Sequence, residues 1–287
     1  MKSFRSSDTA RLIARSIILA SKDPDRSKLV SSETVDFLTQ ILGKDCLCRA
    51  TGSSVVRRSL LLAERFLLPG IITHYLARKI HLEREVEKAI SEGCRRVIVL
   101  GAGYDTLAWR LQAKHPQIEF VEIDHPATQQ LKADRLSAGP NLKLKALDLT
   151  SDLPSSQMAS DGLPTIFVLE GLTMYFSPGR VEALMKDVSN LTGKDGKVIW
   201  SFMEKQSKGS LGFQGESRLV PRWLRFRGEP FLWGISRDGL EDFSSRCGLK
   251  TEGLADHRSL RREVLKPCGL DDLPLARGEL ICTSIPS

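Results

Sequence analysis

Four polar positions in this sequence follow strand-like segments, which is the pattern of a ligand site along one edge of a parallel sheet. The glycine turn 101–103 follows the apolar run 97–100, and Asp124, Asp148 and Glu170 each follow a later strand-like segment. Glycine allows a tight turn beneath a ligand, and carboxylates accept hydrogen bonds from its hydroxyl or amine groups. Because ligands bind beyond the carboxyl ends of parallel strands, we expect these residues to surround one nucleotide-type cofactor.

The spacing of two of these carboxylates suits an adenosine group. Asp124 comes 21 residues after Gly103, the distance at which a carboxylate at the tip of the second strand can bind both ribose hydroxyls. Asp148 follows the next strand along the chain and could accept a hydrogen bond from the adenine amine. The alternatives are a helix cap for Asp124 and a loop turn for Asp148. On this basis the cofactor is either NAD or S-adenosylmethionine.

Two further charges occupy unusual positions. Glu170 ends a wholly apolar segment, where it would bind a cofactor ammonium group or the backbone amides of the next turn. Arg78 lies on the apolar stripe of the helix that follows Gly70, and a buried guanidinium requires an anion. That anion is the carboxylate of a cofactor or an internal partner such as Glu85 or Asp105, unless the side chain reaches solvent at the helix edge.

The elements that would position these residues form an α/β pattern. Residues 1–92 are helical in periodicity, and from 93 onward short apolar strands alternate with helices, which predicts a mostly parallel, Rossmann-like sheet with helices on both faces. We therefore expect a helical cap over 1–92 and a cofactor-binding core over 93–287. Seven strands are expected, at 97–100, 118–123, 142–147, 165–169, 197–202, 249–254 and 279–285.

One segment, 204–235, interrupts this alternation after the fifth strand with glycines, serines and a basic-aromatic patch. We interpret it as an insertion that covers the ligand site at the edge of the sheet, or as an exposed loop whose arginines are solvated. A third interpretation makes the chain a non-catalytic RNA-binding protein that uses this patch. Its side chains would be Arg218, Arg222, Arg225 and Arg227 beside Trp223 and Phe226.

Composition narrows the class of protein only slightly. The 287 residues are 41% hydrophobic, enough for a large core, and no apolar run approaches the roughly 20 residues of a membrane span. Arg15 interrupts the apolar N-terminal stretch, so we expect a cytoplasmic protein without a signal peptide. The six scattered cysteines lack zinc-site spacing, and we expect no metal. A net charge of +7 does not identify a partner.

Several motifs resemble one known family. HYLARK at 74–79, VIVLGAGYDTLAWRL at 97–111 and FVEIDHP at 120–126 are the first three. ALDLT at 146–150, VLEGLTMYFSP at 168–178 and GEPFLWGI at 228–235 extend the series. Together they resemble the leucine carboxyl methyltransferase-like class I S-adenosylmethionine-dependent methyltransferases, which include bacterial O-methyltransferase homologues.

This resemblance implies a role for each candidate. Its cofactor-binding set would be Arg78 on the methionine carboxylate, Gly101, Ala102 and Gly103 along the methionine and ribose, Asp124 on the ribose, Asp148 and Leu149 at adenine, and Glu170 near the methionine amino group. It also suggests that Arg15 could reach the cofactor from the opening helix. Thr106 replaces the third glycine of a dinucleotide fingerprint, which disfavours the alternative of an NAD-dependent oxidoreductase.

The implied reaction is methyl transfer to an oxygen of a small molecule or a carboxyl-bearing acceptor. A carboxylate acceptor needs no general base, whereas an alcohol or phenol benefits from one. His257 and Tyr175 are the weak catalytic candidates, and His125 is expected at the rim of the cofactor site. The acceptor and the oligomeric state cannot be predicted from the sequence.

Overall fold

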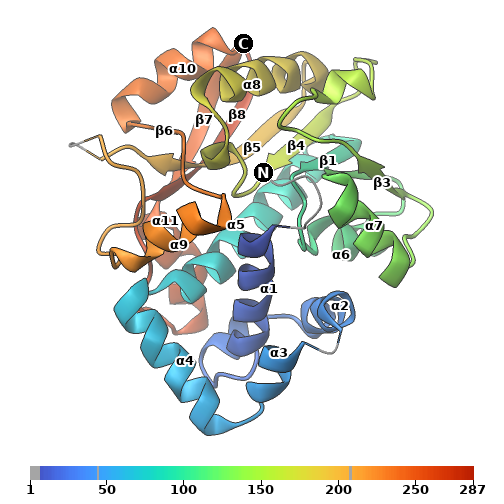
Figure 1. Cartoon of the computed structure of the whole chain (residues 1–287). Coiled ribbons are helices and arrows are strands. Elements are labelled where there is room, and N and C mark those ends of the chain that lie inside the picture. Colours follow the sequence, from blue (N-terminus) through green and yellow to red (C-terminus); the bar gives the residue numbers. More distant parts are fainter. Residues whose placement is uncertain (1–6, 44, 207–208) are drawn as a thin grey trace.

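The computed structural model describes residues 7–43, 45–206 and 209–287, and it places a central sheet between helices (Figure 1). The strands are β1 Arg96–Leu100, β2 Glu119–Asp124, β3 Leu142–Ala146, β4 Thr165–Leu169, β5 Lys197–Glu204, β6 Gly234–Ile235, β7 Leu249–Ala255 and β8 Glu279–Pro286. The α-helices are α1 Asp8–Ala20, α2 Ser32–Leu42, α3 Cys46–Ala50, α4 Ser54–Leu67, α5 Ile71–Ser91, α6 Leu107–Lys114, α7 Pro126–Arg135, α8 Pro178–Thr192, α9 Leu219–Arg227, α10 Leu240–Arg246 and α11 His257–Leu260.

The sheet has eight strands in a mixed arrangement, which corrects the expected seven. Its order is β3-β2-β1-β4-β5-β8-β7, and β6 pairs with β5 beside this path. Strands β1 to β6 pair in parallel, whereas β8 is antiparallel to both β5 and β7. The two residues of β6 are too few to show a strand periodicity, and the direction of β8 depends on partners far away in sequence.

The central strands are apolar throughout because both faces of the sheet are covered. In β1, Val97 and Val99 pack into the core formed with α5 and α6, whereas Ile98 and Leu100 pack into the core formed with α8 and α10. These four side chains are at most 1% exposed. Burial of β1 on both faces of the sheet therefore explains the continuous hydrophobic run that predicted this strand.

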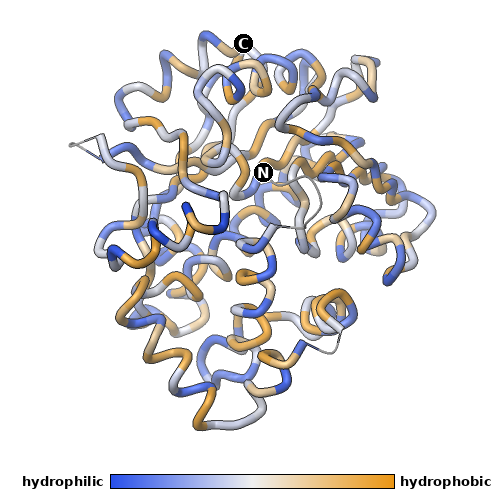
Figure 2. The backbone as a smooth tube through the Cα atoms, in the orientation of Figure 1, coloured by the Kyte–Doolittle hydropathy of each residue, from blue (hydrophilic) through white to orange (hydrophobic). Residues whose placement is uncertain are grey.

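Helices α1 to α4 lie together below the sheet in the view of Figure 1, and α5 passes between them and the strands. Ala14, Ile17 and Ile18 of α1 are buried in the core shared with α5. Helix α4 has no buried residue, and its tube alternates hydrophobic and hydrophilic colour (Figure 2). Residues 1–6 and 44 of the expected cap lie outside the described residues.

The insertion after β5 contains α9 and β6, and its residues 207–208 also lie outside the described residues. The backbone N–H of Ser217 donates to the carbonyl oxygen of Leu67 at 2.8 Å, so the insertion contacts the end of α4. In the described part of the chain no single helix has the length and apolarity of a membrane span. Only α4 and α5 taken together pass that test, and they are bent by 88°.

Candidate active site

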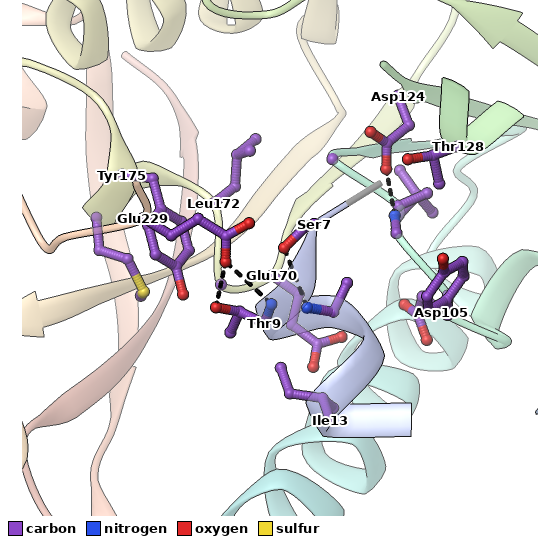
Figure 3. A pocket seen from close by; sticks show the side chains of 18 of the residues that line it. Ser7, Thr9, Ile13, Asp105, Asp124, Thr128, Glu170, Leu172, Tyr175 and Glu229 are labelled. Atoms are coloured by element: carbon purple, nitrogen blue, oxygen red, sulfur yellow. Dashed lines mark hydrogen bonds between the residues drawn. The ribbon is translucent and has the colours of Figure 1, made fainter. Parts of the chain in front are cut away.

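A cavity opens at the carboxyl ends of β1, β2 and β4, where the order of the sheet reverses. Figure 3 shows the cavity from close by, with Asp124 and Thr128 at one end, Tyr175 and Glu229 at the other, and Glu170 between them. All sequence candidates for the site except His257 and Arg15 line it. Those that do are Arg78, Gly101, Ala102, Gly103, Asp124, His125, Asp148, Leu149, Glu170 and Tyr175.

The glycine turn at the end of β1 is held in a conformation that other residues rarely adopt. Gly101 has φ +65°, and a Cβ atom there would lie 2.6 Å from Cδ1 of Leu172. Gly103 has φ +48°, and its Cβ would lie 3.3 Å from that of Ala10 in α1. A side chain at Gly101 would collide with Leu172, and one at Gly103 would crowd Ala10 in a backbone conformation that favours glycine.

Asp124, at the tip of β2, accepts hydrogen bonds from the backbone N–H groups of Gly103 and His125. Burial raises the pKa of Asp124, although these two N–H groups counteract the rise. A carboxylate offers about four lone-pair sites. Asp124 therefore keeps acceptor capacity for two ligand hydroxyls while it stabilises the glycine turn.

Asp148 and Leu149 follow β3 at the same edge. Asp148 accepts from the backbone N–H and the hydroxyl of Thr150 at 2.9 and 2.6 Å, so it does form the loop turn that was the alternative interpretation. The Leu149 side chain is buried, at 5% exposure. This end of the cavity combines a carboxylate at its rim with an apolar wall.

Arg78 is buried, at 3% exposure, and its partners are two carboxylates. Its Nη1 lies 2.7 Å from both oxygens of Glu279, and its Nε and Nη2 lie 2.9 and 2.7 Å from Oε1 of Glu170. Burial would lower the pKa of Arg78, but the charges of Glu279 and Glu170 raise it. The internal partners suggested by the sequence, Glu85 and Asp105, are therefore wrong.

The ion-pair cluster continues through Lys79 and His74. The Lys79 ammonium donates to Asp105 and Glu170 at 2.9 and 3.0 Å. His74 Nε2 lies 2.8 Å from Oε2 of Glu279. Burial alone would raise the pKa of Glu279, but Arg78 and His74 outweigh that effect and hold the pKa at about 2. The cluster joins α5 to the ends of β4 and β8, so it fixes one wall of the cavity.

Two buried polar atoms of the cavity lining have no hydrogen-bond partner in the part of the chain that the structure describes. They are the hydroxyl of Tyr104 and Oδ2 of Asp105, and both follow the glycine turn. Buried polar groups are normally paired, so an unpaired donor and an unpaired acceptor beside a cavity suit a polar ligand. The lining thus fits a cofactor that carries hydroxyl and charged groups.

The N-terminus of α1 closes the cavity beside the insertion. The backbone N–H groups of Asp8 and Thr9 donate to the Glu229 carboxylate at 3.1 and 2.9 Å, and the Thr9 hydroxyl donates to the same carboxylate. In Figure 3 the Tyr175 hydroxyl lies next to this group. The insertion that was expected to cover the crevice therefore contacts α1 over the cavity.

The leucine carboxyl methyltransferase family matches residues 12–189, which is more than half of the chain. The chain belongs to this family. In Bacillus subtilis, "Putative S-adenosyl-L-methionine-dependent methyltransferase YktD" is 22% identical over 206 residues, covering 69% of this chain and 64% of that protein. This chain thus spans less than two thirds of that relative's length.

A second relative covers more of its own length. In Mycobacterium bovis, "Putative S-adenosyl-L-methionine-dependent methyltransferase" is 23% identical over 278 residues, covering 92% of this chain and 87% of that protein. A crystal structure of a "putative methyltransferase" from Thermobifida fusca shares 17% identity with a TM-score of 0.58, covering 87% of this chain and 92% of that one. At that identity the likeness shows a shared fold.

Further polar residues of this leucine carboxyl methyltransferase family member line the cavity although sequence reasoning did not place them there. They include Thr9, Lys79, Glu229 and Glu279. Lys79 and Glu229 belong to the HYLARK and GEPFLWGI motifs that we quoted for the resemblance, so their motifs carried a signal. Glu279 begins a predicted strand, but nothing in the sequence indicates that β8 inserts beside β5.

Two sequence candidates of this family member lie away from the cavity. His257 begins α11 and does not line the cavity, and Arg15 binds Asp45 at 2.6 Å rather than facing the glycine turn. His125 lines the rim and accepts at Nδ1 from Ala127 N–H, as a cap of α7.

Among residues 7–43, 45–206 and 209–287, no group of three or more acidic, His or Cys side chains could hold a metal ion.

Of the arginines considered for RNA binding, Arg218 is the N-cap of α9 and the other three lie on that helix. Arg218, Arg222, Arg225 and Arg227 are exposed, and Arg227 forms an ion pair with Asp8 at 3.2 Å and a cation–π contact with Trp223. None of the four lines the cavity. RNA binding by this patch stays an untested alternative.

Proposed function

We propose that this protein transfers the methyl group of S-adenosylmethionine to an oxygen of a small molecule or a carboxyl-bearing acceptor. The observation that carries the proposal is a single cavity that contains the glycine turn at Gly101 and Gly103, the Asp124 carboxylate, and the charged pair Arg78 and Glu170. Methionine is zwitterionic, so an arginine beside a glutamate matches both of its charged groups. The names of the relatives and the family membership support the same cofactor.

The proposed cofactor contacts assign each part of the cofactor to a group that lines the cavity. Arg78 would bind the methionine carboxylate on the edge that faces Gly171, where a Cβ atom would lie 3.5 and 3.6 Å from Nη1 and Nη2. Glu170 would accept from the methionine ammonium, and Asp124 from the ribose hydroxyls. Asp148 and Leu149 would contact the adenine, and Ala102 with its two glycines would lie along the methionine and ribose.

When bound, the cofactor supplies an activated methyl group on a sulfonium sulfur. The chain would contribute alignment and exclusion of water, because this displacement requires the acceptor oxygen and the methyl group to lie in line. Helix α1 and the insertion meet over the cavity through Glu229. We therefore propose that the helical cap 1–92 and the insertion 204–235 enclose the acceptor.

The proposal is tested by incubating the purified protein with cell extract and methyl-labelled S-adenosylmethionine, followed by mass spectrometry. We expect a labelled, methylated product and an equivalent amount of S-adenosylhomocysteine. The Asp124→Ala variant is the control and should lose both signals. Formation of neither product by the wild-type protein, in extracts from several growth conditions, would contradict the proposal.

A further inference from the structure

The end of the cavity away from Asp124 is lined by aromatic rings from three separate segments. Tyr75 comes from α5, Tyr175 follows β4, and Phe213 and Phe231 belong to the insertion. The ring centroids of Tyr175 and Phe231 are 5.6 Å apart, and those of Phe213 and Phe231 are 6.3 Å apart. We call these four residues the aromatic wall. A flat apolar ring packs favourably against such a surface.

The charges that line the cavity are unfavourable for an anionic acceptor. The only Lys or Arg side chains among the lining residues that the structure describes are Arg78 and Lys79, and carboxylates already bind both. Even with the sulfonium of the cofactor in place, carboxylates remain in excess. A carboxylate acceptor would therefore enter without a free cation, which is unfavourable for a buried charge. The six carboxylates of the lining are Asp105, Asp124, Asp148, Glu170, Glu229 and Glu279.

Glu229 differs from the other two glutamates near the aromatic wall. Glu170 and Glu279 are ion-paired with Arg78, whereas Glu229 accepts hydrogen bonds from the N-terminus of α1 and forms no ion pair in the described part of the chain. Burial raises the pKa of the Tyr175 phenol, which disfavours loss of its proton. Glu229 is thus the carboxylate at this end that is best placed to take a proton.

We propose that the acceptor is an uncharged hydroxyl compound with an apolar ring that packs on the aromatic wall, and that Glu229 takes its hydroxyl proton. This inference rests on the proposed function and chooses between its two acceptor classes. The acceptor oxygen forms a bond to the methyl carbon while the carbon–sulfur bond breaks. The sulfur keeps the electron pair as S-adenosylhomocysteine, and the proton passes to the carboxylate of Glu229.

The acceptor class is tested with two probes of matched shape, 1-naphthol and 1-naphthoate, titrated into the protein saturated with S-adenosylhomocysteine. We expect 1-naphthol to bind at least about tenfold more tightly, because the naphthoate charge has no free partner. Phe231→Ala should weaken 1-naphthol binding and leave S-adenosylhomocysteine affinity unchanged. Tighter binding of 1-naphthoate, or no saturable binding of 1-naphthol to the loaded protein, overturns the inference.

The role of Glu229 is tested by comparing 1-naphthol with naphthalene, which has the same ring but no hydroxyl. In Glu229→Gln the preference for 1-naphthol should fall by about tenfold, the value of one hydrogen bond to a charged group. A purely structural role would weaken both probes equally and would contradict the assignment. Glu241→Gln, on the exposed surface of α10, is the matched control and should keep the wild-type preference.

Failure of this inference and failure of the proposed function give different results. If S-adenosylhomocysteine binds and the naphthol preference is absent, only the acceptor class and the role of Glu229 are wrong. If S-adenosylhomocysteine itself does not bind, the cofactor assignment is wrong, and the acceptor inference falls with it.

Discussion

Arg78 and Glu279 form a buried ion pair in which Nη1 of the arginine lies 2.7 Å from both carboxylate oxygens. The contact joins α5 to β8 across 201 positions of the sequence. Glu170 and His74 bind the same pair from two sides. The wall of the cavity is therefore built from charges whose partners come from both halves of the chain.

The Glu279→Gln substitution should destabilise the protein by roughly 2 to 4 kcal/mol, because it removes one of the two carboxylates that compensate a buried guanidinium. Urea unfolding measures the loss. The control is Glu182→Gln, which breaks an exposed pair with Lys186 on α8 and should have little effect on stability. Equal losses in the two variants would contradict a structural role for the buried pair.

The same pair predicts the pH dependence of stability. The pKa of Glu279 in the folded protein is about 2, below the ordinary value of 4.5. A lowered carboxyl pKa stabilises the fold above the ordinary value, and that contribution is lost as the pH falls from about 4.5 toward 2. Thermal unfolding should show a steeper fall over this range in the wild type than in Glu279→Gln. Identical slopes would exclude this origin.

Two glycines allow the glycine turn to be tested with a matched control. Gly101→Ala places a Cβ atom 2.6 Å from Leu172 at φ +65°, whereas Gly162→Ala has φ +72° and no atom within 4 Å. Both variants carry a similar backbone strain, of about 1 to 2 kcal/mol. Only Gly101→Ala should also weaken S-adenosylhomocysteine binding, which isothermal titration measures. Equal affinities would show that the turn does not line the cofactor site.

Asp124→Ala should weaken S-adenosylhomocysteine binding by more than about tenfold, because two ribose hydroxyls lose a charged acceptor. Asp134→Ala, on the exposed side of α7, is the control and should keep the wild-type affinity. For Arg78 the suitable change is Arg78→Lys, since Arg78→Ala would leave Glu279 without its main cation. An unchanged affinity in Asp124→Ala would remove this residue from the proposed site.

Local sequence patterns predicted most of the fold. The apolar runs placed β1 and β4 within one residue of their observed bounds, and His125-Pro126 marked the start of α7. The pairing of β8 between β5 and β7 could not be predicted, because alternation along a strand carries no information about its partner or direction.

One rule of sheet topology predicted part of the site. Residues at the carboxyl ends of parallel strands meet, and Gly101, Asp124, Asp148 and Glu170 accordingly line one cavity. The ion-pair partners predicted for Arg78 were wrong. One observed partner, Glu279, reaches the cavity only because it begins the antiparallel strand β8. Long-range pairing of side chains leaves no periodic signal in a single sequence.

The central claim is that the cavity binds S-adenosylmethionine, and titration calorimetry of the purified protein with S-adenosylhomocysteine tests it most directly. The account predicts saturable binding at one site per chain with a dissociation constant below about 0.1 mM, a binding free energy of at least roughly 5 kcal/mol. This binding should be weakened by more than about tenfold in Asp124→Ala and should be unchanged in Asp134→Ala. No binding at millimolar ligand would contradict the account.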